Sequence, residues 1–131
     1  MIGLDTNVLI RYLAQDDVKQ AALATRLVES LTPEQPGFVS HVVLVEIVWV
    51  LETCYGADAA KIEQVVETLL RIAGIVVDRA EVVWRALRQF KQSRGDFSDA
   101  LVVGLARDAG SEKVYTFDQI AAKRHGMTQL K

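Results

Sequence analysis

The sequence predicts an α/β protein with a central parallel sheet of four to five strands and helices on both faces. Short apolar segments alternate along the chain with longer segments whose apolar residues recur at helical spacing. Such alternation is typical of βα units, whose crossovers place helices on the faces of a parallel sheet. Half of the 131 residues are hydrophobic and only two are proline, which is typical of a globular chain.

Local signals in the first part of the chain place two strands and four helices. Asp16 and Asp17 suit a helix start, and the Pro- and Gly-containing segment 33–37 predicts a loop. Ser40 is a suitable N-cap and Gly56 a suitable stop for the helix between them. The elements expected here are strands at 2–4 and 38–39, and helices at 7–14, 16–31, 41–55 and 57–73.

The second part of the chain follows the same alternation. Asp78 and Glu81 resemble a capping box at a helix start, Arg94 and Gly95 interrupt the next helical pattern, and Gly110 ends another. No repeat or linker divides the sequence, so residues 1–131 are expected to form one domain. The elements expected here are strands at 75–77 and 113–116, an edge strand at 127–130, and helices at 79–92, 97–108 and 119–124.

Five carboxylates occupy positions that suggest one shared site. Asp5 and Asp118 follow strands and therefore fall at the carboxyl edge of the predicted sheet, where open α/β sheets bind ligands. Asp96 and Asp99 begin a helix and share one face of it. Glu46 interrupts the most hydrophobic stretch, where we expect core residues around it. Acidic side chains are rarely buried unless they are paired or bind a cation.

A divalent metal would explain such a cluster. Two carboxylates about 4 Å apart repel by ~4 kcal/mol at an effective dielectric constant near 20. Oxygen ligands favour Mg²⁺ or Mn²⁺, and His41 and His125 lack the companions that a tetrahedral zinc site needs. Structural alternatives remain: Asp5 and Asp96 also fit helix caps, and Glu46 also fits a buried ion pair.

Polar neighbours of the acids are candidates for orienting them by hydrogen bonds, although turn and cap formation would also explain these residues. They are Thr6, Asn7 and Thr116. One predicted helix also has a basic side, which fits either a phosphate contact or a solvated face. Its members are Arg85, Arg88, Lys91 and Arg94.

Net charge and cysteine content restrict partners and location. The net charge is −2, and removing the five negative charges of the carboxylates leaves +3, so a polyanionic partner is compatible with the chain. The single cysteine, Cys54, excludes an internal disulfide and fits a reducing cytoplasm, and we expect it in the core. The N-terminal apolar run has no basic flank and ends at Asp5, so no signal peptide is expected. The apolar run 42–51 is too short for a membrane span.

In their order along the chain, these motifs resemble the PIN-domain nucleases, most closely the VapC toxins of bacterial toxin–antitoxin pairs. The resemblance rests on residues 5–9 (Asp-Thr-Asn-Val-Leu), Glu46, residues 96–101 (Asp-Phe-Ser-Asp-Ala-Leu) and residues 116–118 (Thr-Phe-Asp). It implies a three-layer α/β/α sandwich and an endoribonuclease that cuts single-stranded RNA with Mg²⁺ or Mn²⁺, with tRNA or rRNA as expected targets. It also implies a cognate antitoxin and a homodimer.

The resemblance assigns roles to the acids. Asp5, Glu46, Asp99 and Asp118 match the acidic quartet of the family, while Asp96 matches an extra acid present in many VapC-like members. All five are therefore expected at the metal. A homodimer also fits the apolar residues of 42–51 and 62–70, which exceed what one face of each helix needs for the core.

Two other functions are compatible with some of these features. A phosphatase of the haloacid-dehalogenase type also has an aspartate after its first strand, but its chemistry needs a second acid two residues later, where this chain has Asn7. A non-catalytic binding module would use the acids to neutralise an Arg-rich partner segment. Cleavage of RNA with Mg²⁺, and its loss with EDTA, would distinguish a nuclease from both.

Overall fold

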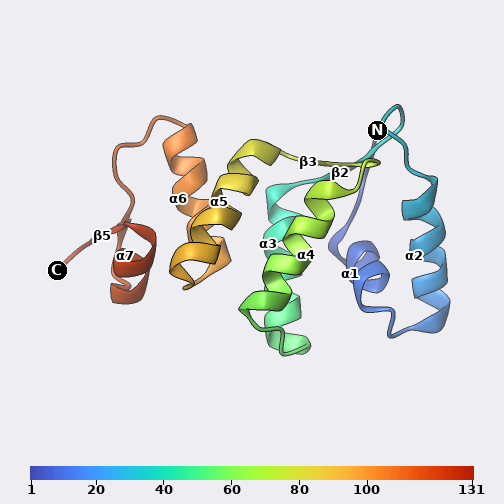
Figure 1. Cartoon of the computed structure of the whole chain (residues 1–131), viewed down its shortest axis with the longest axis horizontal. Coiled ribbons are helices and arrows are strands. Elements are labelled where there is room, and N and C mark those ends of the chain that lie inside the picture. The colour runs from blue at the N-terminus through green and yellow to red at the C-terminus, as the bar shows by residue number, and fades with distance from the viewer. The chain divides into compact units, whose positions relative to one another are not determined.

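The computed structural model describes residues 1–131 and divides into two compact units, Met1–Asp78 and Arg79–Lys131 (Figure 1). The first unit contains β1 (Ile2–Gly3), α1 (Thr6–Ala14), α2 (Val18–Ser30), β2 (Gly37–Val39), α3 (His41–Cys54), α4 (Ala59–Arg71) and β3 (Ile75–Val77). The second contains α5 (Ala80–Ser93), α6 (Phe97–Asp108), β4 (Tyr115–Thr116), α7 (Gln119–His125) and β5 (Thr128–Gln129).

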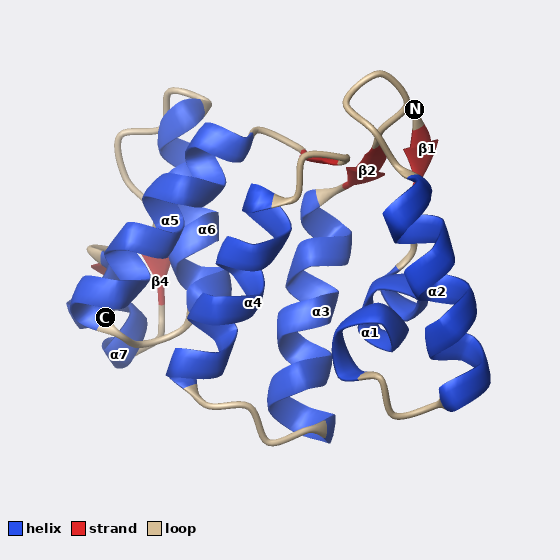
Figure 2. Cartoon of the chain, turned by 45° about the vertical axis from the view of Figure 1, so that its right-hand side comes forward, coloured by secondary structure: helices blue, strands red, loops and turns tan.

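In the first unit a parallel sheet has the strand order β1-β2-β3. Ile2 pairs with Gly37, and Gly37 with Ile75, so the three strands begin in register. Two helices connect each strand to the next, as a parallel crossover requires. The pairs α1 with α2 and α3 with α4 pack side by side beneath the strands (Figure 2).

Capping residues set the helix starts of the first unit. The side chains of Asp17, Ser40 and Asp58 each accept a hydrogen bond from the backbone amide three residues later, which satisfies an otherwise unpaired donor. The helices then bury their apolar faces against each other and the strands. The core of this unit includes Leu4, Leu9, Ile10, Val28, Val39, Leu44, Ile47, Val48, Leu51, Ile62, Val66 and Leu69.

In the second unit α5 packs along α6, and α7 contacts both helices. Phe90 and Phe97 meet edge to face, with ring centroids 6.0 Å apart, at the centre of this packing. The helix α7 connects β4 to β5, which pair in parallel. The core of this unit includes Val82, Val83, Leu87, Phe90, Phe97, Leu101 and Ala121.

The structure contains the five predicted strands, and every pairing among them is parallel. Their hydrogen bonds join them as groups of three and two instead of one sheet of four to five strands. Each strand has only two or three residues, so the apolar pattern locates a strand without specifying its neighbour. None of the helices is long and apolar enough to cross a membrane.

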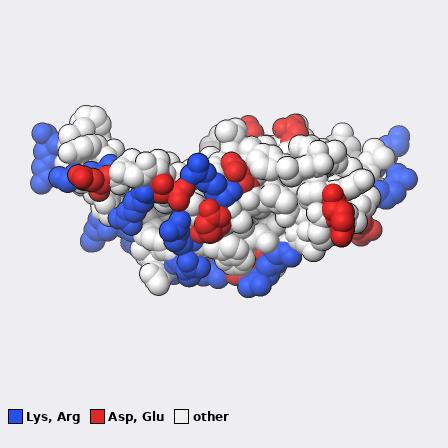
Figure 3. Space-filling view, turned by 90° about the horizontal axis from the view of Figure 1, so that it is seen from above, with Lys and Arg blue, Asp and Glu red and all other residues white.

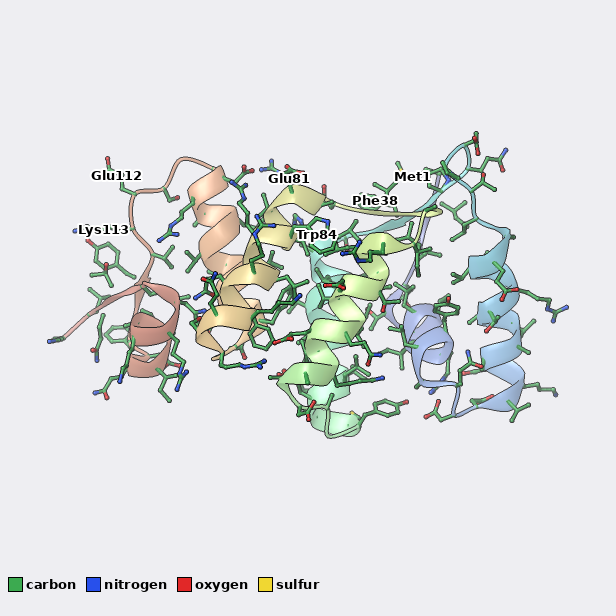
Figure 4. The ribbon with its side chains drawn as sticks, in the orientation of Figure 1. Met1, Phe38, Glu81, Trp84, Glu112 and Lys113 are labelled. Atoms are coloured by element: carbon green, nitrogen blue, oxygen red, sulfur yellow. The ribbon has the colours of Figure 1, made fainter.

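Two local predictions are wrong. Asp78 and Glu81 do not form a capping box, because α5 begins after Arg79, whose backbone is left-handed (φ 45°) and whose side chain does not cap the helix. Glu81 lies in the first turn of α5 (Figure 4). Cys54 is exposed rather than buried, because it ends α3 instead of facing the core.

Candidate metal centre and active site

Asp5 connects β1 to α1 and occupies the N-cap position of that helix. Its backbone is extended (φ −84°, ψ 159°), as an N-cap requires, but its side chain makes no capping hydrogen bond. The carboxylate is exposed. The helix-cap alternative therefore lacks the hydrogen bond that would explain an aspartate here, and both carboxylate oxygens remain available to a ligand.

Glu46 lies in α3 and accepts a 2.8 Å hydrogen bond from the Thr6 hydroxyl. Thr6 is buried, whereas Glu46 is exposed, so the expectation that core residues surround Glu46 is wrong. Val42 and Trp49, one turn away on either side, are also largely exposed, at 70% and 61%. Because α3 is apolar on nearly every side, its sequence does not reveal which face points to solvent.

Asp96 and Asp99 begin α6. Asp96 is the N-cap, and its Oδ1 accepts a hydrogen bond from the Asp99 amide at 3.0 Å. The cap role predicted as one alternative for Asp96 is thus confirmed, although only one of its two carboxylate oxygens is used. Asp99 lies in the first turn, where the positive end of the helix dipole favours a negative charge.

Asp118 is the N-cap of α7 and lies two residues after the end of β4. Its Oδ1 accepts hydrogen bonds from the amides of Ile120 (2.8 Å) and Ala121 (3.0 Å). The Thr116 hydroxyl accepts a 3.0 Å hydrogen bond from the Asp118 amide. Thr116 and the first turn of α7 therefore hold this aspartate from both sides and leave Oδ2 without a partner.

The pKa of Asp99 reflects both its burial and the acids around it. Burial raises the pKa of Asp99, the carboxylate of Asp96 raises it further, and Asp118 contributes in the same direction. The second unit thus gathers three carboxylates closely enough for their charges to interact.

The donor set fits a hard divalent cation. The carboxylate of Asp99 accepts no hydrogen bond, and Asp96 and Asp118 each retain one unused oxygen. Three carboxylates with four free oxygens are therefore available as ligands, and a cation would relieve the repulsion among them. No three acidic, histidine or cysteine side chains meet closely enough to form a complete metal cage.

The other predicted residues have different surroundings. Asn7 is exposed and borders an apolar groove between α1 and α2, away from any hydrogen bond to an acid. Arg85 lies 3.7 Å from Asp108, which also binds Arg79. The whole basic set, Arg85, Arg88, Lys91 and Arg94, is exposed. Basic and acidic side chains are interspersed on the face visible in Figure 3.

Sequence patterns do not indicate that His125 and Gln89 lie beside the candidate site. His125 is only 4% exposed, and it hydrogen-bonds both to Gln89 and to the backbone amide of Asp96. The partners lie 29 and 36 positions away along the chain, so no local motif connects them. The pairing becomes visible only once α5, α6 and α7 are packed.

The model of the PIN domain family matches residues 2–126, nearly the whole chain. The chain therefore belongs to the PIN domain family, which confirms the predicted fold class. It is also similar to the VapC ribonuclease of Aquifex aeolicus (strain VF5). The two are 28% identical over 114 residues, which cover 87% of this chain and 84% of the relative.

Proposed function

We propose that this chain is a metal-dependent endoribonuclease that cuts single-stranded RNA and acts as the toxin of a toxin–antitoxin pair. The observation that carries the proposal is the cluster of Asp96, Asp99 and Asp118 around helix starts in a PIN-domain chain. The similarity to a VapC ribonuclease supports the choice of RNA as substrate. The expected targets are tRNA or rRNA.

We assign the metal, Mg²⁺ or Mn²⁺, to five carboxylates. Asp5, Asp99 and Asp96 would hold it, and Glu46 and Asp118 would complete the site directly or through water. When bound, the metal would lower the pKa of a water molecule and neutralise the charge that develops on the phosphate during hydrolysis.

The chain's own residues would prepare these ligands. The Thr6 hydroxyl donates to Oε1 of Glu46 and so restricts the rotation of that carboxylate, leaving Oε2 for the site. Thr116 and the α7 amides fix Asp118 in one orientation. Partners of this kind typically change metal affinity or activity by about 10–100-fold when removed.

The partners follow from the same assignment. The basic set, which lies on α5 and at its C-cap, would bind RNA phosphates, which would make RNA binding sensitive to salt. A cognate antitoxin would inhibit the enzyme, and the chain would act as a homodimer in the cytoplasm. The exposed apolar side chains of α3, Val42 and Trp49, are candidates for the dimer interface.

The proposal is tested by incubating the purified protein with single-stranded and duplex RNA of the same sequence, with Mg²⁺, with Mn²⁺ and with EDTA. We expect cleavage of the single strand with either metal and none with EDTA. Cleavage in EDTA, or no cleavage of any RNA with either metal, would contradict it. A covalent phosphate trapped on Asp5 would instead favour the phosphatase alternative.

A further inference from the structure

We propose that His125 is a positioning residue that holds the turn carrying Asp96 and so places two of the assigned metal ligands. This inference rests on the proposed function for its link to metal. His125 lies at the end of α7 and is almost fully buried. Its Nε2 lies 2.9 Å from the backbone nitrogen of Asp96, and its Nδ1 lies 2.8 Å from Oε1 of Gln89.

These contacts specify one state of the imidazole. A backbone amide can only donate, so Nε2 of His125 must be the unprotonated acceptor. The proton of the neutral ring is then on Nδ1, which donates to the side-chain amide oxygen, Oε1, of Gln89. Gln89 is oriented in turn, because its amide nitrogen donates to the Arg124 carbonyl and to the Ser93 hydroxyl. A neutral His125 is thus satisfied at both nitrogens.

The turn held by His125 has an unusual backbone. Arg94 (φ 59°, ψ −133°) and Gly95 (φ 76°) both have positive φ, and the Arg94 conformation is one that only glycine adopts readily. A guanidinium nitrogen of Arg124 donates to the Ser93 carbonyl just before the turn, at 2.7 Å. The last residues of α7 therefore contact both ends of the turn.

Close packing reinforces this arrangement. A Cβ atom on Gly95 would lie 2.4 Å from Nε2 of His125, so only glycine leaves room for the ring at this position. The next residue, Asp96, donates its amide to that nitrogen and uses its carboxylate to cap α6 at Asp99. Displacement of the ring would therefore release Asp96 and, through the cap, the first turn that carries Asp99.

The experiment compares three substitutions. His125→Gln retains an acceptor where Nε2 reaches Asp96, whereas His125→Asn is too short to do so and His125→Phe has no acceptor. Phe90→Leu is the control, because it loosens the same unit's core at Phe97 but retains the Phe90 backbone carbonyl, which accepts the hydrogen bond from the Arg94 amide of the turn. The measurements are Mn²⁺ affinity by electron paramagnetic resonance, exchange of the Asp96 amide hydrogen without metal, and the imidazole ¹⁵N shifts of the wild type.

We expect His125→Phe and His125→Asn to bind Mn²⁺ about tenfold more weakly and to exchange the Asp96 amide faster. His125→Gln should restore both properties, and the ¹⁵N shifts should show the proton on Nδ1. A proton on Nε2, unchanged amide exchange in His125→Phe, or equal weakening of Mn²⁺ binding by Phe90→Leu would overturn the inference. If the wild type binds no Mn²⁺ while its Asp96 amide depends on His125, the proposed function fails and the positioning role stands.

Discussion

The hydroxyl of Thr6 donates a 2.8 Å hydrogen bond to the carboxylate of Glu46, two residues forty positions apart in the sequence. Thr6 begins α1, one residue after Asp5, and Glu46 lies in the middle of α3. Because α1 also packs on α3, this contact fixes the start of one helix against the side of another. The placement of Glu46 thus depends on a buried hydroxyl and not on a hydrophobic surrounding.

Replacing Thr6 with valine removes the hydrogen bond between α1 and α3 while retaining the shape of the side chain. We expect Thr6→Val to lower RNA cleavage about tenfold, because Glu46 loses the group that orients it. The free energy of unfolding should fall by about 1 kcal/mol for the lost hydrogen bond. Cleavage rates and urea denaturation measure the two effects. Thr6→Ser, which retains the hydroxyl, is the control and should remain close to wild type in cleavage.

Asp5→Asn and Asp99→Asn should each abolish RNA cleavage, since both remove a charged ligand while preserving side-chain size. Circular dichroism should show an intact fold in both. Asp58→Asn is a matched control: Asp58 caps α4, and asparagine caps a helix equally well. Full activity in a folded Asp5 or Asp99 variant would exclude that residue from the site.

Asp99 should also make stability depend on pH. Because burial and the neighbouring Asp96 and Asp118 raise its pKa, the folded chain holds this proton more tightly than the unfolded chain does. The free energy of unfolding therefore decreases as pH rises through the interval between the two pKa values. At neutral pH it remains lower, and this loss of stability is the penalty for the ionised Asp99. The effect is small, since solvent screens this partly exposed carboxylate.

Asp99→Asn removes that penalty. Without divalent metal it should raise Tm at pH 7 by about 1–2 °C, and this gain should vanish below the ordinary pKa of an aspartate. Adding Mg²⁺ should stabilise the wild type more than the variant. Calorimetric scans at pH 3 and pH 7, with and without Mg²⁺, measure all three differences, and a variant less stable than wild type at pH 7 would contradict the sign.

The two glycines Gly95 and Gly56 allow the clash with His125 to be isolated. Both have similar positive φ values (76° and 64°), so alanine incurs a similar backbone cost at each. Only at Gly95 would the new Cβ meet another atom closely; at Gly56 it meets nothing within 4 Å. Gly95→Ala should therefore lose about 1–3 kcal/mol more stability than Gly56→Ala in denaturant titrations.

The proposed homodimer can be examined through Trp49. Light scattering at micromolar concentration should give the mass of a dimer, and Trp49→Ser should shift that mass towards a monomer, since an exposed tryptophan is typical of an interface. Val18→Ser is the control, because Val18 is 87% exposed on α2. A wild type that is monomeric at this concentration would refute the dimer.

Sequence patterns located the elements of this fold closely. Residues such as Ser40 and Gly56 mark helix ends through local chemistry, and α6 and β3 have the predicted limits. Strand partners were harder to predict, because strands of two or three residues carry little register information. The start of α5 was mispredicted because Arg79 has a left-handed backbone, and an arginine in the sequence does not indicate that conformation.

The candidate site was likewise predictable only in part. The acids were recognisable because carboxylates beside apolar runs are rare, and Asp96, Asp99 and Asp118 do gather at helix starts. The exposure of Glu46 was not predictable, because an apolar helix does not reveal its solvent-facing side. The contact of His125 with Asp96 could not be predicted from the sequence, because no local pattern around a histidine indicates which distant residue it will contact.

The short helix α7 has Asp118 as its N-cap and His125 as its last residue. Each residue of an α-helix advances the side-chain direction by about 100°. An insertion or deletion within α7 would therefore rotate the imidazole away from the turn even if every side chain were retained. Relatives that use the same arrangement should vary in the composition of this segment but not in its length.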